Sequence, residues 1–312
     1  MTMFPKRSAM VQAEAFLRAT FSFTAGAAAG QAPVQSITGF GCQALRAPAG
    51  LAVDGDRILV ADTANDRVQI FTTTGRFIRS IAGHGANALS GPTGVAVDAG
   101  NGGTVLVVDA GNNRIQVFDA ESNFIRSIGT NALSCPRAVA VDAANCSNVL
   151  IADAGTNRIQ VFTAAGRFIR SICGTGVNAL IAPSGVAIDP ANDANVVVAD
   201  AFNHRIQVFT SHGAFVRTIR GRGMNSLNIP TSVAVDPCND SNVLVVDSEN
   251  DRVQIFSATG SFLHSVEARG ANALNEPFGV AIDARNGRTV LVSDSANNRV
   301  QLFGGALVPA FA

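Results

Sequence analysis

The chain has 312 residues, of which 47% are apolar and 15% are charged, and its formal net charge at pH 7 is zero. This apolar content is enough for a sizeable core and excludes an intrinsically disordered chain. The balanced charge gives no general attraction to nucleic acid or to an anionic membrane. No run of about 18 apolar residues occurs, so the sequence predicts no membrane-spanning helix. Five irregularly spaced cysteines predict neither a disulfide framework nor a CxxC zinc site, and we expect reduced thiols in the cytoplasm.

Residues 1–32 form an N-terminal extension that precedes all repeated sequence. Apolar residues recur at roughly helical spacing over residues 8–20, but Gln12, Glu14 and Arg18 interrupt them, which disfavours a secretory signal. We interpret the segment as a short helix or arm followed by a flexible linker over residues 26–30. Its basic and hydroxyl residues also fit an organelle-targeting segment, so targeting by residues 1–30 stays open.

From residue 48 onward the sequence repeats six times, and each unit opens with a proline. The prolines are Pro48, Pro92, Pro136, Pro183, Pro230 and Pro277. Successive prolines are separated by 44 residues twice and then by 47 residues three times. The two short units each lack three residues, one within residues 54–62 and the other within residues 128–136. Both deletions fall between strand signals, where a change of length does not turn side chains to the wrong face of a sheet.

Each unit contains four strand signals, as in residues 94–98, 105–108, 114–118 and 124–128. These short segments are rich in Val, Ile and Phe, and turn residues separate them. Helical periodicity is absent from the repeats. Four short strands in every 44 to 47 residues, repeated in tandem, are typical of the blades of a β-propeller.

The last unit contains only three strand signals before residues 304–312, which we assign to a C-terminal tail. The missing strand matches the other end of the repeat region, because residues 33–45 align with residues 77–89. Pairing of this N-terminal strand with the last unit would close the ring and remove two exposed sheet edges. The sequence therefore predicts an all-β fold: a six-bladed β-propeller of four-stranded blades over residues 33–303, its last blade closed by an N-terminal strand. Blades are numbered 1 to 6 from Pro48.

Three motifs of the repeat resemble the NHL repeat family of propellers over residues 33–303. They are Pro-x-Gly-Val-Ala-Val-Asp, a strand that ends in Val-Asp or Ala-Asp, and Asn-x-Arg-Ile-Gln-Val-Phe. The chain departs from the family because it lacks the aromatic residues that members often place in the second strand and the connecting loop. The resemblance implies the propeller fold and does not by itself imply one function.

A ten-residue stretch, first seen at residues 62–71, keeps Asp first, Arg sixth, Gln eighth and Phe last in every unit, with Asn fourth except for Thr156. A residue present in all six blades is best explained by structure: the Asp can bond the turn backbone, and the Arg can return to its carboxylate. A ring of ligand-binding carboxylates is the disfavoured alternative. Arg79, Arg126, Arg170 and Arg217 are expected on the outermost strands, where a charge opposes edge pairing. The Asp and Arg pairs are Asp62 and Arg67, Asp109 and Arg114, Asp153 and Arg158, Asp200 and Arg205, Asp247 and Arg252, and Asp294 and Arg299.

Function is expected where the blades differ. The residue after each opening proline should lie near the central channel, and only Arg137 and Phe278 are large there. Lying in blades three apart, they could grip an anionic or planar group, or they could simply plug the channel. Blade 4 and its exit loop hold the other departures, whose mixture of Arg, aromatic residues and Met is typical of protein interfaces. An alternative is drift on a solvated loop. These candidate rim residues are Phe202, His204, Arg220, Arg222, Met224 and Asn225.

Three classes of function were weighed. Related six-bladed propellers include an amidating lyase with histidine-bound metal and lactonases with a central calcium, but the channel positions here hold no His, Asp, Glu or Asn, and Tyr is absent. We therefore predict no cofactor and no metal, and an enzyme with an unrecognised site is disfavoured. Some NHL propellers bind single-stranded RNA, but acidic residues offset the cations on that face. We favour a soluble, monomeric scaffold that binds a protein or peptide, without membrane contact.

Overall fold

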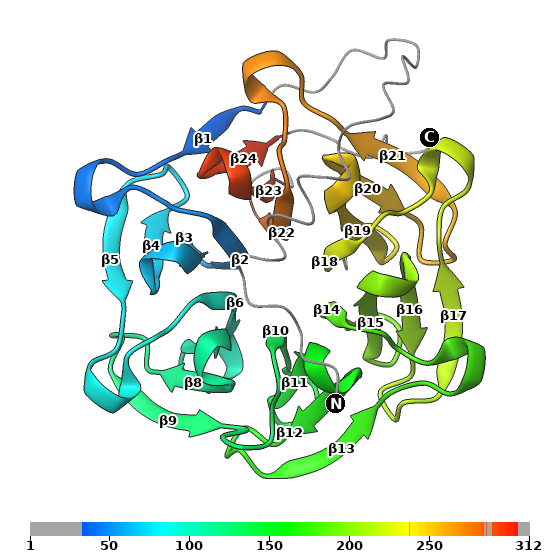
Figure 1. Cartoon of the computed structure of the whole chain (residues 1–312), viewed down its shortest axis with the longest axis horizontal. Helices are drawn as coiled ribbons and strands as arrows, with labels where there is room; N and C mark the ends of the chain where they lie inside the picture. The colour runs from blue at the N-terminus through cyan, green and yellow to red at the C-terminus, as the bar shows by residue number, and fades with distance from the viewer. Residues whose placement is uncertain (1–32, 237, 284, 286–288, 305–312) are drawn as a thin grey trace. The chain divides into compact units, whose positions relative to one another are not determined.

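The computed structural model describes residues 33–236, 238–283, 285 and 289–304. The extension predicted for residues 1–32 and all but the first residue of the predicted tail lie outside this range. The described residues form six four-stranded antiparallel sheets arranged as the blades of a β-propeller (Figure 1). The fold predicted from the repeats is confirmed. No helix in the described part of the chain is long and apolar enough to cross a membrane.

Each blade runs from the innermost to the outermost strand in chain order, except that blade 6 takes its outermost strand from the N-terminal end. Blade 1 holds β2 (Pro48–Asp54), β3 (Arg57–Asp62), β4 (Arg67–Thr72) and β5 (Phe77–Ile81). Blade 2 holds β6 (Pro92–Asp98), β7 (Thr104–Asp109), β8 (Arg114–Phe118) and β9 (Phe124–Ile128). Blade 3 holds β10 (Pro136–Asp142), β11 (Asn148–Asp153), β12 (Arg158–Phe162) and β13 (Phe168–Ile172).

Blade 4 holds β14 (Pro183–Asp189), β15 (Asn195–Asp200), β16 (Arg205–Phe209) and β17 (Phe215–Ile219). Blade 5 holds β18 (Pro230–Asp236), β19 (Asn242–Asp247), β20 (Arg252–Phe256) and β21 (Phe262–Val266). Blade 6 holds β22 (Pro277–Asp283), β23 (Thr289–Asp294), β24 (Arg299–Phe303) and β1 (Gln35–Ile37). The strands of each blade are short, as expected for a tightly twisted four-stranded sheet.

The ring is closed by the pairing of β1 with β24. Gln35 lies opposite Leu302, and Ile37 lies opposite Val300, in antiparallel register. Figure 1 shows the two strands side by side, with β1 in blue and β24 in red. Blade 6 therefore joins the two ends of the described chain, as the alignment of residues 33–45 with 77–89 predicted.

The hydrophobic core lies between neighbouring blades. The second strand of each blade is buried on both faces, which explains its continuous apolar sequence. The Phe that ends each third strand is buried against the preceding blade, as when Phe118 of blade 2 joins Leu59 and Ile70 of blade 1 in one cluster. The repeated Phe is therefore a packing residue, because it fills the hydrophobic core between its own blade and the preceding one.

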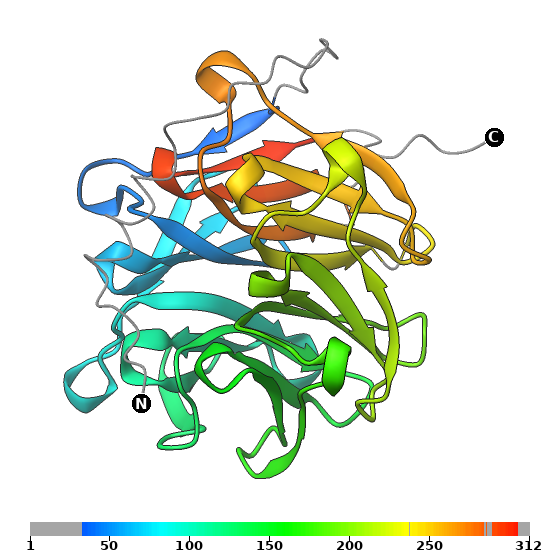
Figure 2. The same ribbon diagram turned by 45° about the vertical axis from the view of Figure 1, so that its right-hand side comes forward.

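The antiparallel order gives the propeller two distinct faces, which Figure 2 shows obliquely. One face carries the connections between blades and the turns between second and third strands, and we call it the loop face. Short 3-10 turns occur in both kinds of segment, as in Gly85–Asn87 and Ala110–Asn112. The opposite face carries the two remaining turns of each blade. The predicted rim residues all belong to segments of the loop face.

Candidate functional site: the loop face

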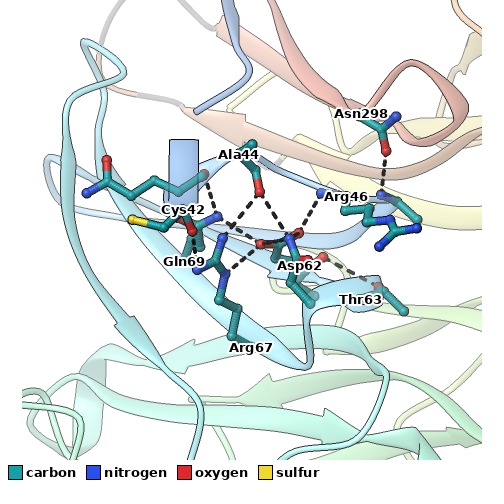
Figure 3. A network of polar contacts seen from close by, with 12 residues as sticks. Cys42, Ala44, Arg46, Asp62, Thr63, Arg67, Gln69 and Asn298 are labelled. Atoms are coloured by element: carbon teal, nitrogen blue, oxygen red, sulfur yellow. Dashed lines mark hydrogen bonds and ion pairs between the residues drawn. The ribbon is translucent and has the colours of Figure 1, made fainter. Parts of the chain in front are cut away.

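The carboxylate of Asp62 is the centre of a polar network beneath the loop face (Figure 3). Its Oδ2 accepts hydrogen bonds from Nε of Arg67 and Nε2 of Gln69, both at 2.8 Å. Its Oδ1 accepts the backbone N–H of Arg46 at 2.7 Å, and Asn65 Nδ2 donates to both oxygens. Asp62 is fully buried, so these donors replace the water that the carboxylate loses. The network ties the second and third strands to the loop that enters the blade.

The same arrangement recurs around the ring. In each blade the Asp is fully buried and accepts a backbone N–H from the entering loop at 2.6–2.7 Å. In five blades the Arg Nε lies 2.6–2.8 Å from the Asp Oδ2. Hydrogen bonds to charged groups contribute about 1.5–3 kcal/mol each where water is excluded. With its oxygens occupied by protein donors, each Asp ties two strands of its blade to the loop that enters that blade.

Blade 3 departs from this pattern. Its entering connection, residues 129–135, is the one shortened by three residues, and it lacks the 3-10 turn of the other entering loops. Thr156 replaces the usual Asn and donates its hydroxyl to Asp153. Arg158 Nε donates to Thr156 Oγ1 at 3.1 Å and lies 3.9 Å from Asp153 Oδ2. Among the described residues, neither Thr156 nor Arg158 donates to a carbonyl of the entering loop, and the Arg158 side chain is 38% exposed.

The outer arginines connect neighbouring blades. Arg79, Arg126 and Arg170 lie on the outermost strands, as predicted, and each donates through Nη2 to a carbonyl in the next blade: Ala120, Ala164 and Ser211. These side chains were expected to oppose edge pairing. The structure gives them a further role, because the guanidinium reaches across the seam to the turn between the third and fourth strands of the next blade.

Arg137 and Phe278 both line a cavity of about 80 Å³ at the centre of the ring. Thr93, Ser184 and Thr231, which occupy equivalent positions, line it as well. Their hydroxyls donate across the seams to carbonyls of the next blade, as when Thr93 Oγ1 binds the Arg137 carbonyl at 3.0 Å. Pockets for drug-sized ligands occupy about 300–1,000 Å³, so this cavity is too small for such a ligand. It has room for a few water molecules.

The blade 4 rim contains exposed side chains of three kinds. Phe202 and Met224 are large apolar residues exposed to solvent, and Arg220 and Arg222 are exposed cations. His204 has a structural contact, since its Nδ1 accepts the backbone N–H of Ile229 at 3.1 Å. Asp or Asn accepts the same bond in the other blades, as Asn113 does from Cys135.

Asn225 ends the 3-10 turn Gly223–Asn225, a position that other blades also fill with Asn, as in Asn178 and Asn272. It is therefore a repeat residue rather than a departure from the repeat.

Three residues of the loop face were not among the predicted binding residues: Val177 and Ile181, which were not predicted at all, and Arg158, which was predicted only as the structural partner of Asp153. Val177 and Ile181 are large, exposed apolar side chains in the loop that enters blade 4. A comparison of blades position by position within the connecting loops would have revealed Ile181, because polar residues occupy its position in the other five blades. The altered environment of Arg158 follows from the loop deletion and could be seen only in the structure.

The histidines lie at four unrelated places in the repeat: His84, His204, His212 and His264. Among the described residues, no group of three or more His, Cys, Asp or Glu side chains is placed to hold a metal ion.

The chain is thus a six-bladed β-propeller whose repeated polar residues hold the blades together and whose loop face carries the differences between blades. A family model described as a six-bladed β-propeller matches residues 47–146. No curated protein matches the sequence.

Several solved structures share the fold. A streptogramin B lyase is 14% identical, with a TM-score of 0.60 over 88% of this chain and 86% of that chain. A structural genomics protein of unknown function from Bacteroides thetaiotaomicron is 14% identical, with a TM-score of 0.66 over 83% of this chain and 70% of that one. The nidogen/laminin complex contains a chain that is 19% identical, with a TM-score of 0.62 over 74% of this chain and 83% of that one. At these identities the likeness shows the fold alone.

Proposed function

We propose that this chain is a non-catalytic binding propeller of the NHL type, which recognises a protein or peptide partner on its loop face. The observation that carries the proposal is the exposure of Phe202 and Met224 in blade 4 and its exit loop, next to the exposed cations Arg220 and Arg222. Exposed apolar side chains that gather with arginines are typical of protein interfaces, whereas single exposed apolar residues are ordinary.

The organisation of the fold supports a scaffold. The Asp networks fix each loop to its own blade, so the loops present a rigid surface whose exposed side chains can vary without cost to the core. A rigid surface loses little conformational entropy on binding a partner. Another propeller of this fold occurs in the nidogen/laminin complex, a precedent for protein binding by the fold.

A small-molecule substrate fits the molecule less well. The cavity between Arg137 and Phe278 is small, and the hydroxyls beside it already bind carbonyls of neighbouring blades. These two residues are therefore better explained as filling the channel than as gripping a ligand. The likeness to streptogramin B lyase extends to the fold and does not supply a reaction for this chain.

The proposal is tested by capturing partners from a lysate on the immobilised full chain, with and without nuclease, followed by mass spectrometry. Phe202→Ser and Arg222→Glu should each abolish capture of the partner. Arg167→Glu is the matched control, because Arg167 is an exposed cation in a turn on the opposite face, and it should capture normally. Equal capture by all three variants would remove the loop face as the binding surface. Loss of capture after nuclease treatment would instead indicate RNA binding.

A further inference from the structure

Three repeat positions around the entrance of blade 4 are all occupied by large apolar residues, which happens in no other blade. They are the centre of the entering 3-10 turn, the residue whose N–H binds the buried Asp, and the centre of the turn between second and third strands. In blade 4 these residues are Val177, Ile181 and Phe202, which we call the blade 4 patch. In blade 1 they are Cys42, Arg46 and Ala64, and in blade 5 they are Met224, Asn228 and Glu249.

Hydrogen bonds hold the three residues in neighbouring segments of the loop face. Phe202 donates its backbone N–H to the carbonyl of Ile181 at 3.3 Å. Arg205 donates through Nη1 to the carbonyl of Val177 at 2.8 Å and through Nε to Asp200 at 2.6 Å. Nevertheless the patch is open to solvent, since Val177 is 87%, Phe202 52% and Ile181 44% exposed. Exposed apolar side chains on neighbouring segments favour a binding surface over single exposed residues, which are ordinary.

A cation with open donors lies beside the patch. Asn157, the residue before Arg158, accepts the backbone N–H of Ala182, the residue after Ile181, at 2.7 Å. The Arg158 side chain is 38% exposed, whereas its equivalent Arg205 is 3% exposed. In five blades a terminal nitrogen of this Arg donates to carbonyls of the entering loop. Within the described residues, neither terminal nitrogen of Arg158 has such a partner. These nitrogens form a planar fork suited to a carboxylate.

Acidic residues are concentrated in the half of the loop face over blades 5 and 6. The five loop-face segments over blades 3 and 4, residues 129–135, 154–157, 173–182, 201–204 and 220–229, contain no Asp or Glu and include Arg220 and Arg222. Two segments of blades 5 and 6, residues 248–251 and 267–276, contain four acidic residues, and the first borders the exit loop of blade 4, since Glu249 donates its backbone N–H to the Asn228 carbonyl at 3.4 Å. The chain as a whole is neutral, so the half over blades 3 and 4 is locally cationic while the molecule is not. A partner that meets it should therefore carry negative charge next to apolar side chains.

We infer that the loop face over blades 3 and 4 binds an acidic segment of a protein, with a bulky apolar side chain on the blade 4 patch and a carboxylate on Arg158. This inference rests on the proposed function and names the chemistry of its partner. A peptide fits better than single-stranded RNA, because Val177 and Ile181 are aliphatic and only Phe202 offers a ring on which a base could stack. Arg222 is placed to attract the same negative charge from the exit loop of blade 4.

The test selects peptides of about 12 residues from a random display library on the immobilised full chain. A selected peptide is then synthesised, and its affinity is measured by fluorescence anisotropy. Selected peptides should combine Asp or Glu with a bulky apolar residue. Arg158→Gln and Phe202→Ser should each weaken binding by about tenfold or more. Arg269→Gln, which removes an exposed cation on the acidic half, should leave affinity unchanged. Thermal melting confirms that each variant is folded.

The outcomes separate this inference from the proposed function. Two outcomes overturn the acidic partner and leave the binding surface intact. In the first, the selected peptides lack carboxylates. In the second, they bind Arg158→Gln as tightly as the wild type but bind Phe202→Ser more weakly. Failure to enrich any peptide, or binding that neither variant weakens, overturns both. A labelled oligouridylate that binds more tightly than any selected peptide and is lost in Arg158→Gln would assign this half of the loop face to RNA, which also overturns the inference.

Discussion

Arg158 Nε lies 3.9 Å from the carboxylate of Asp153, whereas the five equivalent pairs lie at 2.6–2.8 Å. The longer distance follows from two coupled changes in blade 3, the shorter entering loop and Thr156 in place of Asn. The repeated Arg therefore differs between blades: in five blades it anchors the entering loop, and in blade 3 it is a partly exposed cation.

The first prediction compares these two kinds of arginine. Arg205→Ala should lower the free energy of unfolding by about 3–5 kcal/mol, because it leaves the buried Asp200 carboxylate without its charged partner. Arg158→Ala should cost about 1 kcal/mol or less, because Arg158 is partly exposed and distant from Asp153. Urea denaturation of both variants measures the difference. Equal losses would show that the two arginines hold their blades in the same way.

The second prediction concerns closure of the ring. Deletion of residues 1–38 removes β1, which pairs with β24 and buries Ile37. Burial of such a side chain contributes about 1.5–3 kcal/mol, and the lost strand pairing adds to this. We expect the melting temperature to fall by about 6–12 °C for a total loss near 3 kcal/mol.

Deletion of residues 1–32 is the matched control for closure, because it leaves β1 in place. The difference between the two truncations isolates the contribution of β1. Identical melting curves for the two truncated chains would contradict the assignment of β1 as a closing strand.

The third prediction concerns His204 at the seam between blades 4 and 5. His204→Ala should destabilise the protein by about 1 kcal/mol, because the backbone N–H of Ile229 loses its acceptor. His204→Asn should be tolerated, since Asn113 and Asn298 accept the equivalent bond and Asn adopts the left-handed backbone that His204 occupies at φ 52°. Chemical denaturation distinguishes the variants. If Asn were as harmful as Ala, the imidazole would have another role.

The fourth prediction is a pH dependence at the turn of blade 2 that follows β8. The side chain and then the backbone N–H of Asn123 donate to Asp119, and these bonds hold its pKa below the ordinary value of 3.8. A depressed pKa means that the carboxylate stabilises the native state above the unfolded pKa and loses this effect as the pH falls through the folded one. The melting temperature of Asp119→Ala should therefore lie below that of the wild type at pH 6, and the gap should narrow towards pH 3.5.

Asp119→Thr is the control for this titration. Thr72 and Thr163 occupy the equivalent position in blades 1 and 3, where the hydroxyl accepts a backbone N–H at 3.0–3.1 Å. A hydroxyl does not titrate, so Asp119→Thr keeps its hydrogen bond at low pH, where the wild type loses the stabilisation from its carboxylate. The melting temperature of Asp119→Thr should therefore rise relative to that of the wild type as the pH falls. A difference between Asp119→Ala and the wild type that stayed constant from pH 6 to pH 3.5 would exclude the ionised carboxylate as the cause.

Much of the fold could be predicted because the same pattern of strand and turn residues occurs six times in tandem. The proline spacing located the blades, and the partial seventh match at residues 33–45 predicted the closing pair of β1 and β24. The pairing of Asp62 with Arg67 also followed from their fixed spacing. The site was less predictable. Phe202 stood out as a departure, but His204 looked like a surface residue and proved to bind Ile229.

The sequence by itself determined the blade count, the strand order and the pairing of repeated Asp with repeated Arg that five blades show, because these depend on periodicity and on local spacing along one chain. Only the tertiary structure decided which departures lie together. Val177 and Ile181 lie in the loop that enters blade 4, Phe202 lies in a turn of the same blade, and Arg158 begins β12 of blade 3. Hydrogen bonds between these neighbouring segments bring the four residues to one half of the loop face. The three-residue deletion before blade 3 was visible in the sequence, but its consequence was not. Only the structure shows that Arg158, beside the shortened loop, lies 3.9 Å from Asp153 and is 38% exposed.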